Sequence, residues 1–309
     1  MTLDQTYTQY KSMLFGLAYR MLGIAADAED IVQDVFAQFM QLDAAEIKNE
    51  KAYLTKMTVN RCLNLLQSAR RRRETYTGPW LPEPLPELGT GGDRSDPAER
   101  RETIGYAYLV LMQQLTPLER SVYILRETLG FEYRDIAEMT DKTETSCRKT
   151  FSRAKQKVGQ AGAAKQRGEA REEAQEGFVE AFLRATDTGN FEPLVALLME
   201  EVALVSDGGG KVRAAVNPIL GIARVRAFFE GLAAKGRFLG GFEPARLNGE
   251  PGLLQKRDGL IVMAVMAEWE PEGSRIRRLY IVLNPEKLTR FNRSSPETCR
   301  SQRRAGSTH

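Results

Sequence analysis

The stretch from Leu115 to Val158 constrains the fold of this chain more than any other, because it predicts two helices, a tight turn and a third, basic helix. In the third helix, residues 143–158, apolar or small residues recur at helical spacing and therefore share one face. They are Cys147, Phe151, Ala154 and Val158. The opposite face is polar and basic, which suits the major groove of DNA, although the spacing alone is equally typical of an ordinary amphipathic helix with a solvated side.

The residues before the basic helix complete a helix-turn-helix pattern. A short helix is predicted over residues 133–139 and a turn over residues 140–142, and Thr143 can cap the helix that follows. We expect the first turn and the exposed side of that helix to face DNA. The candidate residues are Glu144, Thr145, Ser146, Arg148, Lys149, Ser152 and Arg153.

Three strings of residues stand out in this stretch. They are Leu-Thr-Pro-Leu-Glu-Arg (115–120), Glu-Tyr-Arg-Asp-Ile-Ala-Glu (132–138) and Ser-Cys-Arg-Lys-Thr-Phe-Ser-Arg-Ala-Lys (146–155). They resemble region 4 of a bacterial sigma factor of the extracytoplasmic-function (ECF) type, which implies that residues 102–159 contact the minus-thirty-five element of a promoter. One departure is Asp141, which stands where these turns usually carry glycine but can adopt a left-handed conformation at modest cost.

Composition limits the number of domains and the functions that the chain can have. With 309 residues, 42% of them hydrophobic and 28% charged, the chain is long enough for two or three globular domains. Its net charge of +3 is too small to indicate DNA binding by itself, so DNA affinity must come from local clusters of Lys and Arg. The single histidine, His309, nearly excludes histidine-based catalysis and histidine metal sites, and we expect no metal.

The sequence also indicates the cellular compartment in which the protein works. The N-terminus has no basic region followed by an apolar core, and the most apolar run, residues 260–267, is far shorter than a membrane span. Cys62, Cys147 and Cys299 have neither paired nor metal-ligand spacing, which favours reduced thiols over disulfides. We therefore expect a cytoplasmic protein.

Residues 5–73 are predicted to be nearly all helix, with a polar loop at 41–50. Two strings in them, Ala-Tyr-Arg-Met-Leu-Gly and Asp-Ala-Glu-Asp-Ile-Val-Gln-Asp-Val-Phe, are similar to sigma region 2. The resemblance implies that Asp30, Gln33 and Asp34 dock on core RNA polymerase. Acidic residues near a helix start could instead simply complement the helix dipole.

The last predicted helix of this region, residues 51–73, is the candidate minus-ten reader. In the resembling family this helix and the loop before it help to open the promoter, with one base flipped into a pocket. The resemblance assigns this role to Asn60, Arg61, Asn64, Arg70 and Arg71. The four consecutive arginines at 70–73 could also favour a helix C-terminus, but beside a DNA face they favour phosphate contacts.

Residues 74–101 form a predicted linker. Prolines at 79, 82, 84 and 86 exclude a helix and favour an extended, semi-rigid connector. The string Trp80-Leu81-Pro82-Glu83-Pro84 resembles a docking peptide for a groove. It is also similar to a string found between regions 2 and 4 in sigma factors that bear a C-terminal domain, so we expect an interdomain, regulatory contact here.

The remainder divides into a helical connector (160–176), an α+β domain (177–289) and a disordered tail (290–309). Helices are predicted at 178–185, 191–198 and 222–234, and strands at 202–205, 212–216, 253–256, 260–270 and 277–283. In order and motif, residues 178–288 resemble the SnoaL-like domain, a cone with a central pocket.

Two motifs of this domain match signatures of the same sigma subgroup. They are Asp207-Gly208-Gly209-Gly210 and Asn284-Pro285-Glu286-Lys287. The resemblance implies that the first faces the pocket or the core and that the second lies near an interdomain contact. As a phosphate loop the glycines are a weak signal, because no Gly-Lys-Ser/Thr ending follows. Catalysis would need an acid or base from Asp207, Glu268 or Glu270, and we expect no enzyme activity.

The order of these parts predicts a multidomain chain, with all-α sigma regions 2 and 4 followed by an α+β SnoaL-like cone. We interpret it as an alternative sigma factor that binds core RNA polymerase and promoter DNA and is regulated in cis by its C-terminal domain. We expect no cofactor and no separate anti-sigma factor, while a small ligand in the cone is left open. Two alternatives are a one-component, ligand-responsive transcription regulator and a SnoaL-like enzyme fused to a DNA-binding module.

Overall fold

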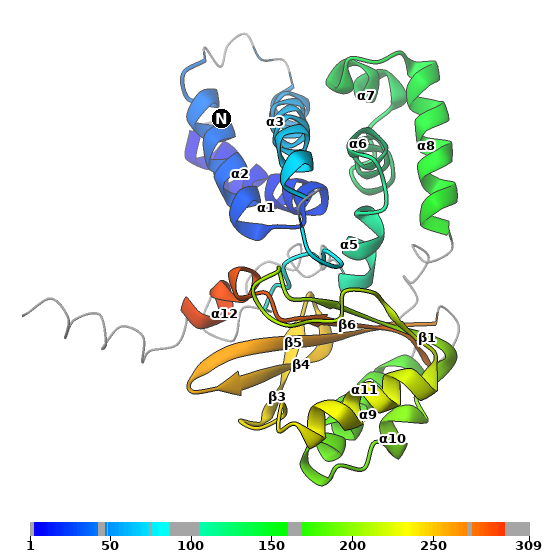
Figure 1. Ribbon diagram of the computed structural model, residues 1–309. Coiled ribbons are helices and arrows are strands. Elements are labelled where there is room, and N and C mark those ends of the chain that lie inside the picture. The colour runs from blue at the N-terminus through cyan, green and yellow to red at the C-terminus, as the bar shows by residue number, and fades with distance from the viewer. Residues whose placement is uncertain are drawn as a thin grey trace, which may run out of the picture. The chain divides into compact units, whose positions relative to one another are not determined.

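Two units make up the computed structural model of the protein (Figure 1). The structure describes residues 3–42, 47, 49–73, 76–86, 105–159, 169–270 and 274–293. Unit 1 comprises residues 1–75, 96–102 and 108–162, and unit 2 comprises residues 76–95, 103–107 and 163–309. The predicted tail beyond residue 293, residues 87–101 of the predicted linker and residues 160–168 of the predicted connector lie outside the described residues.

Unit 1 begins with three helices, α1 (Leu3–Leu22), α2 (Ala25–Phe39) and α3 (Glu50–Arg73). α1 ends at a glycine, Gly23, whose φ of 72° is left-handed and whose amide donates to the carbonyl of Tyr19 at 2.8 Å. Apolar residues at helical spacing bury one side of α2, so its acidic residues lie on the solvent side. The buried residues are Ala25, Ala28, Ile31, Val32, Val35, Phe36 and Phe39.

Short helices form the second part of the helical sequence. They are α5 (Tyr106–Met112), α6 (Pro117–Tyr123), the π-helical turn η2 (Ile124–Thr128), α7 (Tyr133–Thr140) and α8 (Glu144–Val158). Thr116 and Glu119 form a capping box at the start of α6. Lys157 of α8 contacts both carboxylate oxygens of Glu119 at 2.8 Å, which ties α8 to α6. Burial raises the pKa of Glu119, but its bonds to Lys157 and Thr116 outweigh burial and leave that pKa below its ordinary value.

A buried arginine joins the two helical parts of unit 1. Arg120 of α6 is 2% exposed and donates to the carbonyl of Met21, in the last turn of α1. The last carbonyls of a helix have no partner within it, so this guanidinium satisfies a group that would otherwise need water. Arg120 also donates to the side chain of Gln113 at 2.9 Å and to the carbonyl of Leu115 at 3.2 Å.

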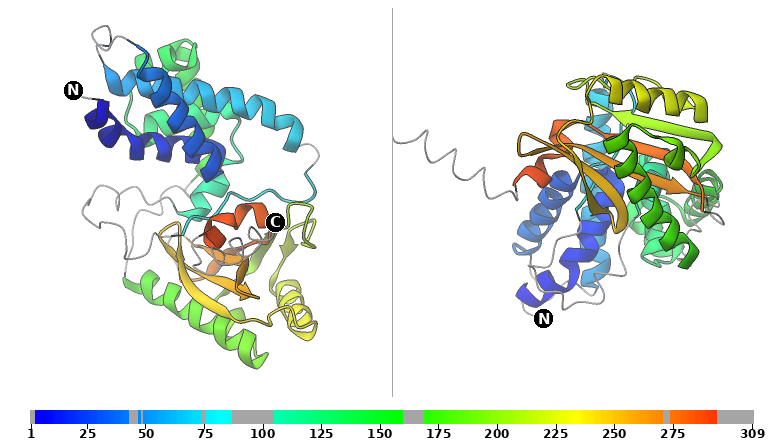
Figure 2. Two further views of the ribbon diagram at one scale, coloured as in Figure 1. Left: turned by 90° about the vertical axis from the view of Figure 1, so that its left-hand side faces the viewer. Right: turned by 90° about the horizontal axis from the view of Figure 1, so that it is seen from below.

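Unit 2 is built on a six-stranded sheet with the order β2-β1-β6-β5-β4-β3. The strands are β1 (Leu198–Asp207), β2 (Ile219–Leu220), β3 (Phe242–Leu247), β4 (Glu250–Arg257), β5 (Leu260–Trp269) and β6 (Ile276–Val282). β1 and β6 are parallel, and the other neighbouring pairs are antiparallel. The helices α9 (Glu169–Thr188), α10 (Glu192–Val195) and α11 (Ile222–Ala234) cover one face, while η4 (Pro285–Lys287) and α12 (Thr289–Arg293) follow β6 on the other (Figures 1 and 2).

Aromatic rings fill the space between these helices and the sheet. The ring centroid of Phe182 lies 5.7 Å from that of Phe229 and 5.1 Å from that of Phe242, and Phe191 stacks on Phe229 at 5.9 Å. Phe178 and Trp269 extend the same cluster with a T-shaped contact at 6.2 Å. These rings therefore form one aromatic cluster between the helices and the sheet.

Three local predictions for unit 2 are wrong. The segment 212–216 is not a strand, because the amides of Lys211 and Val212 turn back to the carbonyl of Gly208 and the amide of Ala215 donates to the hydroxyl of Ser206. The sheet edge is instead β2, a few residues later. β3 was not predicted, and Leu198 begins β1 although the sequence placed it at the end of a helix. In addition, residues 290–293, predicted to begin the disordered tail, belong to α12.

The predicted fold class is confirmed, since helical parts precede an α+β part in the chain. Within the described residues, no helix combines the length and the apolar character needed to cross a membrane.

Candidate functional site

The turn between α7 and α8 has the conformation that the sequence predicted. Asp141 adopts the left-handed region with φ 52° and ψ 52°. Thr143 caps α8, and its side chain accepts a hydrogen bond from the amide of Ser146 at 3.2 Å. The turn and the cap together fix where α8 begins, and therefore which side chains its first turn presents.

The side of α8 predicted to face DNA is accessible. Ser146 is half-buried and the other candidates are exposed, namely Glu144, Thr145, Arg148, Lys149, Ser152 and Arg153. The predicted packing face needs one correction, because Thr150 is buried whereas Phe151 is only half-buried. Phe151 lies at the margin of that face, where its ring stacks on Tyr123 of α6 at 5.8 Å.

On α2, Asp30, Gln33 and Asp34 are exposed and lie opposite the buried apolar face. Asp34 forms an ion pair with Arg61 of α3 at 3.0 Å, and Arg61 also donates to Gln38 at 3.0 Å. The structure therefore brings together a candidate polymerase contact and a candidate minus-ten contact. The pair is largely exposed, so its contribution to stability is small, about 0–1 kcal/mol.

The remaining minus-ten candidates lie on α3. Asn60 and Asn64 are exposed and four residues apart, so they share one side of the helix. Arg70 and Arg71 fall in its last turns, but their side chains lie outside the described residues.

A buried ion pair in unit 2 holds the predicted linker. Asp207, at the end of β1, and Lys287, in η4, are 1% and 5% exposed, and their charged atoms lie 2.7 Å apart. Both bind the backbone of the same linker residue, Leu81. The Leu81 amide donates to Asp207 Oδ2 at 2.9 Å, and Lys287 Nζ donates to the Leu81 carbonyl. We call Asp207, Lys287 and their partners Tyr76, Trp80 and Leu81 the linker clasp.

Two aromatic side chains complete the linker clasp. The ammonium of Lys287 lies 4.0 Å from the ring centroid of Trp80 and 5.3 Å from that of Tyr76. The Tyr76 hydroxyl donates to Asp207 Oδ1 at 2.5 Å and accepts from the side-chain amide, Nδ2, of Asn284 at 3.0 Å. Burial, followed by the bond to Asp207, raises the pKa of Tyr76, so this phenol stays protonated and remains a donor.

The glycines after Asp207 permit the close approach of the two motifs. Gly209 has a φ of 64° and donates its amide to Asp207 Oδ1 at 2.9 Å. A Cβ atom at Gly209 would collide with the side-chain amide of Asn284, and one at Gly208 would collide with the carbonyl of Val212. The motifs at 207–210 and 284–287 therefore meet, with Pro285 beginning the turn that carries Lys287.

The linker is attached at further points along its length. Tyr106 donates its hydroxyl to the carbonyl of Pro82 at 2.7 Å. The amide of Leu85 donates to the side chain of Asn248 at 3.0 Å, and the amide of Asn248 donates back to the carbonyl of Leu85 at 2.8 Å. Residues 81–84 are buried, so the Leu-Pro-Glu-Pro part of the predicted docking peptide lies against unit 2.

Two of the three carboxylates that a catalytic domain could use, Asp207 and Glu268, are held in ion pairs. Asp207 is occupied in the linker clasp, and Glu268 accepts two bonds from Arg278, at 2.9 and 3.0 Å, and one from Tyr280. Burial, followed by the charge of Glu268, raises the pKa of Tyr280. Among the described residues, no group of three or more His, Cys, Asp or Glu side chains is arranged to hold a metal ion.

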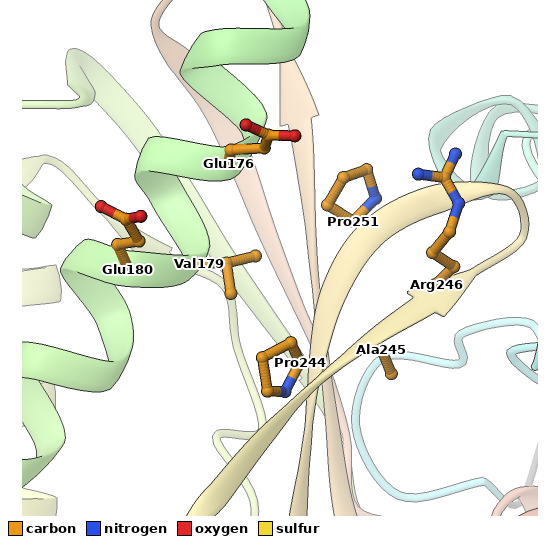
Figure 3. Close-up of a pocket in the computed structure, with 7 residues that line it drawn as sticks. All are labelled: Glu176, Val179, Glu180, Pro244, Ala245, Arg246 and Pro251. Atoms are coloured by element: carbon orange, nitrogen blue, oxygen red, sulfur yellow. The ribbon is translucent and has the colours of Figure 1, made fainter.

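A pocket of about 380 Å³ lies between α9 and the β3–β4 hairpin (Figure 3). Glu176, Val179 and Glu180 line it from α9, and Pro244, Ala245, Arg246 and Pro251 line it from the hairpin. Neither Asp207 nor Glu268 lines this pocket. Its position differs from the central pocket that the resemblance implied.

The sequence did not indicate Tyr76, Tyr106 or Asn248 as binding residues. Each bonds across 24 to 163 positions of sequence, and no local periodicity reports such a contact. The sequence held one usable signal, for Tyr76 alone. Tyr76 lies close to the Trp-Leu-Pro-Glu-Pro string, and a buried tyrosine needs a hydrogen-bond partner for its hydroxyl.

We predict that Lys287→Met releases the linker. The change leaves Asp207 buried without its cation, so it should lower the free energy of unfolding of unit 2 by about 3–5 kcal/mol. Limited chymotrypsin digestion should then cut at Tyr76 and Trp80 faster than in the wild type. The control is Lys211→Met, because Lys211 pairs with Glu286 on the surface and its loss should cost no more than about 1 kcal/mol. Equal cutting of the two variants would contradict the assignment.

Comparison with known proteins agrees with this geometry. The family Sigma-70 region 2 matches residues 6–72, and the family Sigma-70, region 4 matches residues 106–158. The ECF RNA polymerase sigma factor SigJ of Mycobacterium tuberculosis is 33% identical over 288 residues, which cover 89% of this chain and 90% of that protein. The probable ECF RNA polymerase sigma factor SigI of the same organism is 31% identical over 209 residues, covering 65% and 68%.

The likeness extends to the three-dimensional structure. The crystal structure of Mycobacterium tuberculosis SigJ superposes with a TM-score of 0.72 and 27% identity, covering 93% of this chain and 98% of that chain. The match therefore includes the α+β unit as well as the helical regions. This chain belongs to the extracytoplasmic-function RNA polymerase sigma factors.

Proposed function

We propose that the C-terminal α+β unit regulates this sigma factor in cis by binding the linker between regions 2 and 4, the two regions that recognise the promoter. As an ECF sigma factor the chain binds core RNA polymerase, recognises the minus-thirty-five and minus-ten elements and initiates transcription. The observation that carries the proposal is that the buried Asp207 and Lys287 bind the backbone amide and the backbone carbonyl of Leu81, respectively. A linker that only tethers two regions would not need two buried charged side chains to bind its backbone.

The physical basis is the length of the connector between region 2 and region 4. Docking of residues 76–86 fixes part of that connector and so shortens the span over which the two regions can separate. Prolines at 79, 82, 84 and 86 reduce the entropy lost on docking, so a limited set of contacts can hold the segment. Docking therefore changes the separations that the two DNA-reading regions can reach. Such a built-in restraint would serve in place of a separate anti-sigma protein.

We assign the surfaces of the helical regions as follows. Asp30, Gln33 and Asp34 bind core polymerase, and the exposed side of α8 reads the minus-thirty-five element. Asn60, Arg61, Asn64, Arg70 and Arg71 serve the minus-ten element. Support comes from the exposure of most of these side chains on α2, α3 and α8. Arg61 and Ser146 are half-buried, and the assignment of Arg70 and Arg71 rests on sequence alone.

We infer that the α+β unit is a regulatory module and not an enzyme, and that the protein works in the cytoplasm with the polymerase. The support is the ion pairing of Asp207 and Glu268, two buried carboxylates among the catalytic candidates. The pocket beside Glu176 and Glu180 is a candidate site for a small ligand. A ligand-responsive regulator that needs no polymerase contact is the rival, and transcription with purified core polymerase separates the two.

Disruption of the linker clasp should alter transcription. In run-off assays with purified core polymerase, Trp80→Ala and Lys287→Met should change promoter output in the same direction, because each breaks the same restraint. Lys211→Met should match the wild type, since its ion pair with Glu286 is exposed. Wild-type output from both clasp variants would reject regulation through the linker and leave the sigma activity itself untouched.

Charge reversal on α2 tests the polymerase contact separately. Asp30→Lys should weaken binding to core polymerase while the fold is retained, because an exposed charge contributes little to stability. Asp4→Lys is the matched control, since Asp4 is an exposed acidic residue of α1 outside the assigned surface. Binding is measured by titrating labelled protein with core polymerase. Equal affinity of the Asp30 and Asp4 variants would remove the assignment of this surface.

A further inference from the structure

Tyr133, the first residue of α7, lies between two guanidinium groups. The centre of its ring is 4.4 Å from Cζ of Arg148 on α8 and 4.9 Å from Cζ of Arg126 on η2. Both distances are within the range of a cation–π interaction. Two like charges are thus drawn to one aromatic ring beside the helix that reads DNA.

The ring itself is fixed by an aromatic row. Phe151 of α8 meets Tyr133 in a T-shaped contact at 6.1 Å and 74°, and stacks on Tyr123 of α6 at 5.8 Å. Tyr123 is 5% exposed. The row therefore extends from the core of the helix-turn-helix to its surface and ends at Tyr133.

Both arginines are restrained by a carboxylate as well. Arg126 pairs with Glu132 at 3.1 Å and donates to the carbonyl of Phe131 at 2.9 Å. Arg148 lies 3.6 Å from Glu144, one turn earlier in α8. An exposed arginine loses rotamer entropy when it is fixed, so a ring and a carboxylate that fix it beforehand lower the cost of binding.

We infer that Tyr133 is a positioning residue that determines base preference by holding Arg148 ready for its DNA contact. This inference rests on the proposed role of Arg148. A guanidinium can stack through its face and donate through its edge, so contact with the ring is compatible with a bidentate bond from Arg148 to O6 and N7 of guanine. Tyr133 acts through Arg148 and reads no base itself.

The experiment varies the ring's electrostatics at constant shape. Position 133 is filled with tyrosine, phenylalanine or pentafluorophenylalanine in the full-length protein, and each holoenzyme selects promoters from a library randomised in the minus-thirty-five element. Phenylalanine should preserve the preference at the position read by Arg148, because it keeps the negative face of the ring. Pentafluorophenylalanine removes that face and should reduce the preference by about two- to fivefold.

Arg148→Ala identifies the position in question. It should flatten the preference at one base, and adding pentafluorophenylalanine at position 133 should cause no further loss there, because the two residues act in one chain of contacts. Thermal unfolding of each protein checks that the helix-turn-helix is intact.

Several results would overturn the inference. Equal preference with phenylalanine and pentafluorophenylalanine would show that the ring only packs. A uniform loss of affinity for all sequences would indicate a phosphate contact. If Arg148→Ala leaves every base preference unchanged, the assigned role of Arg148 itself fails, and that outcome is distinguishable because it does not depend on position 133.

Discussion

The buried ion pair between Asp207 and Lys287 is the interaction on which unit 2 and its linker both depend. Removing two charges from water is costly, and attraction between them compensates only if the remaining donors and acceptors are also satisfied. Asp207 meets that requirement with donors from Tyr76, Leu81 and Gly209 as well as Lys287. Two of the four donors come from the linker, so the linker is a structural part of the domain that binds it.

Unit 1 depends on a comparable arrangement, with Arg120 as its buried cation. Its guanidinium reaches from α6 to the last turn of α1, where a helix leaves carbonyls without partners. The two helical regions are therefore joined by a polar contact that needs good geometry, rather than by apolar packing alone. A contact of this kind is specific when formed and is lost as a whole when one partner moves.

Much of this account was accessible from the sequence, and the failures have physical causes. Local rules predicted the turn at Asp141 and the cap at Thr143, because both depend on residues close in sequence. Resemblance pointed to Trp80 and to the motifs at 207–210 and 284–287, but not to Tyr76, whose bond to Asp207 spans 131 positions. The apolar residues at 212–216 suggested a strand. The segment forms a turn instead, because its amides donate hydrogen bonds to the carbonyl of Gly208 and the hydroxyl of Ser206.

A photo-crosslinking amino acid at Thr77 tests the central claim most directly. Thr77 is exposed, and its Cβ lies 3.6 Å from where a Cβ of Gly210 would stand, so the probe reports on the linker clasp without replacing a member of it. In the free, full-length protein, irradiation should give an intramolecular crosslink to the segment around residues 207–216, and Lys287→Met should abolish it. A probe that yields no such crosslink, or the same crosslink in both proteins, would contradict the view that Asp207 and Lys287 hold the linker.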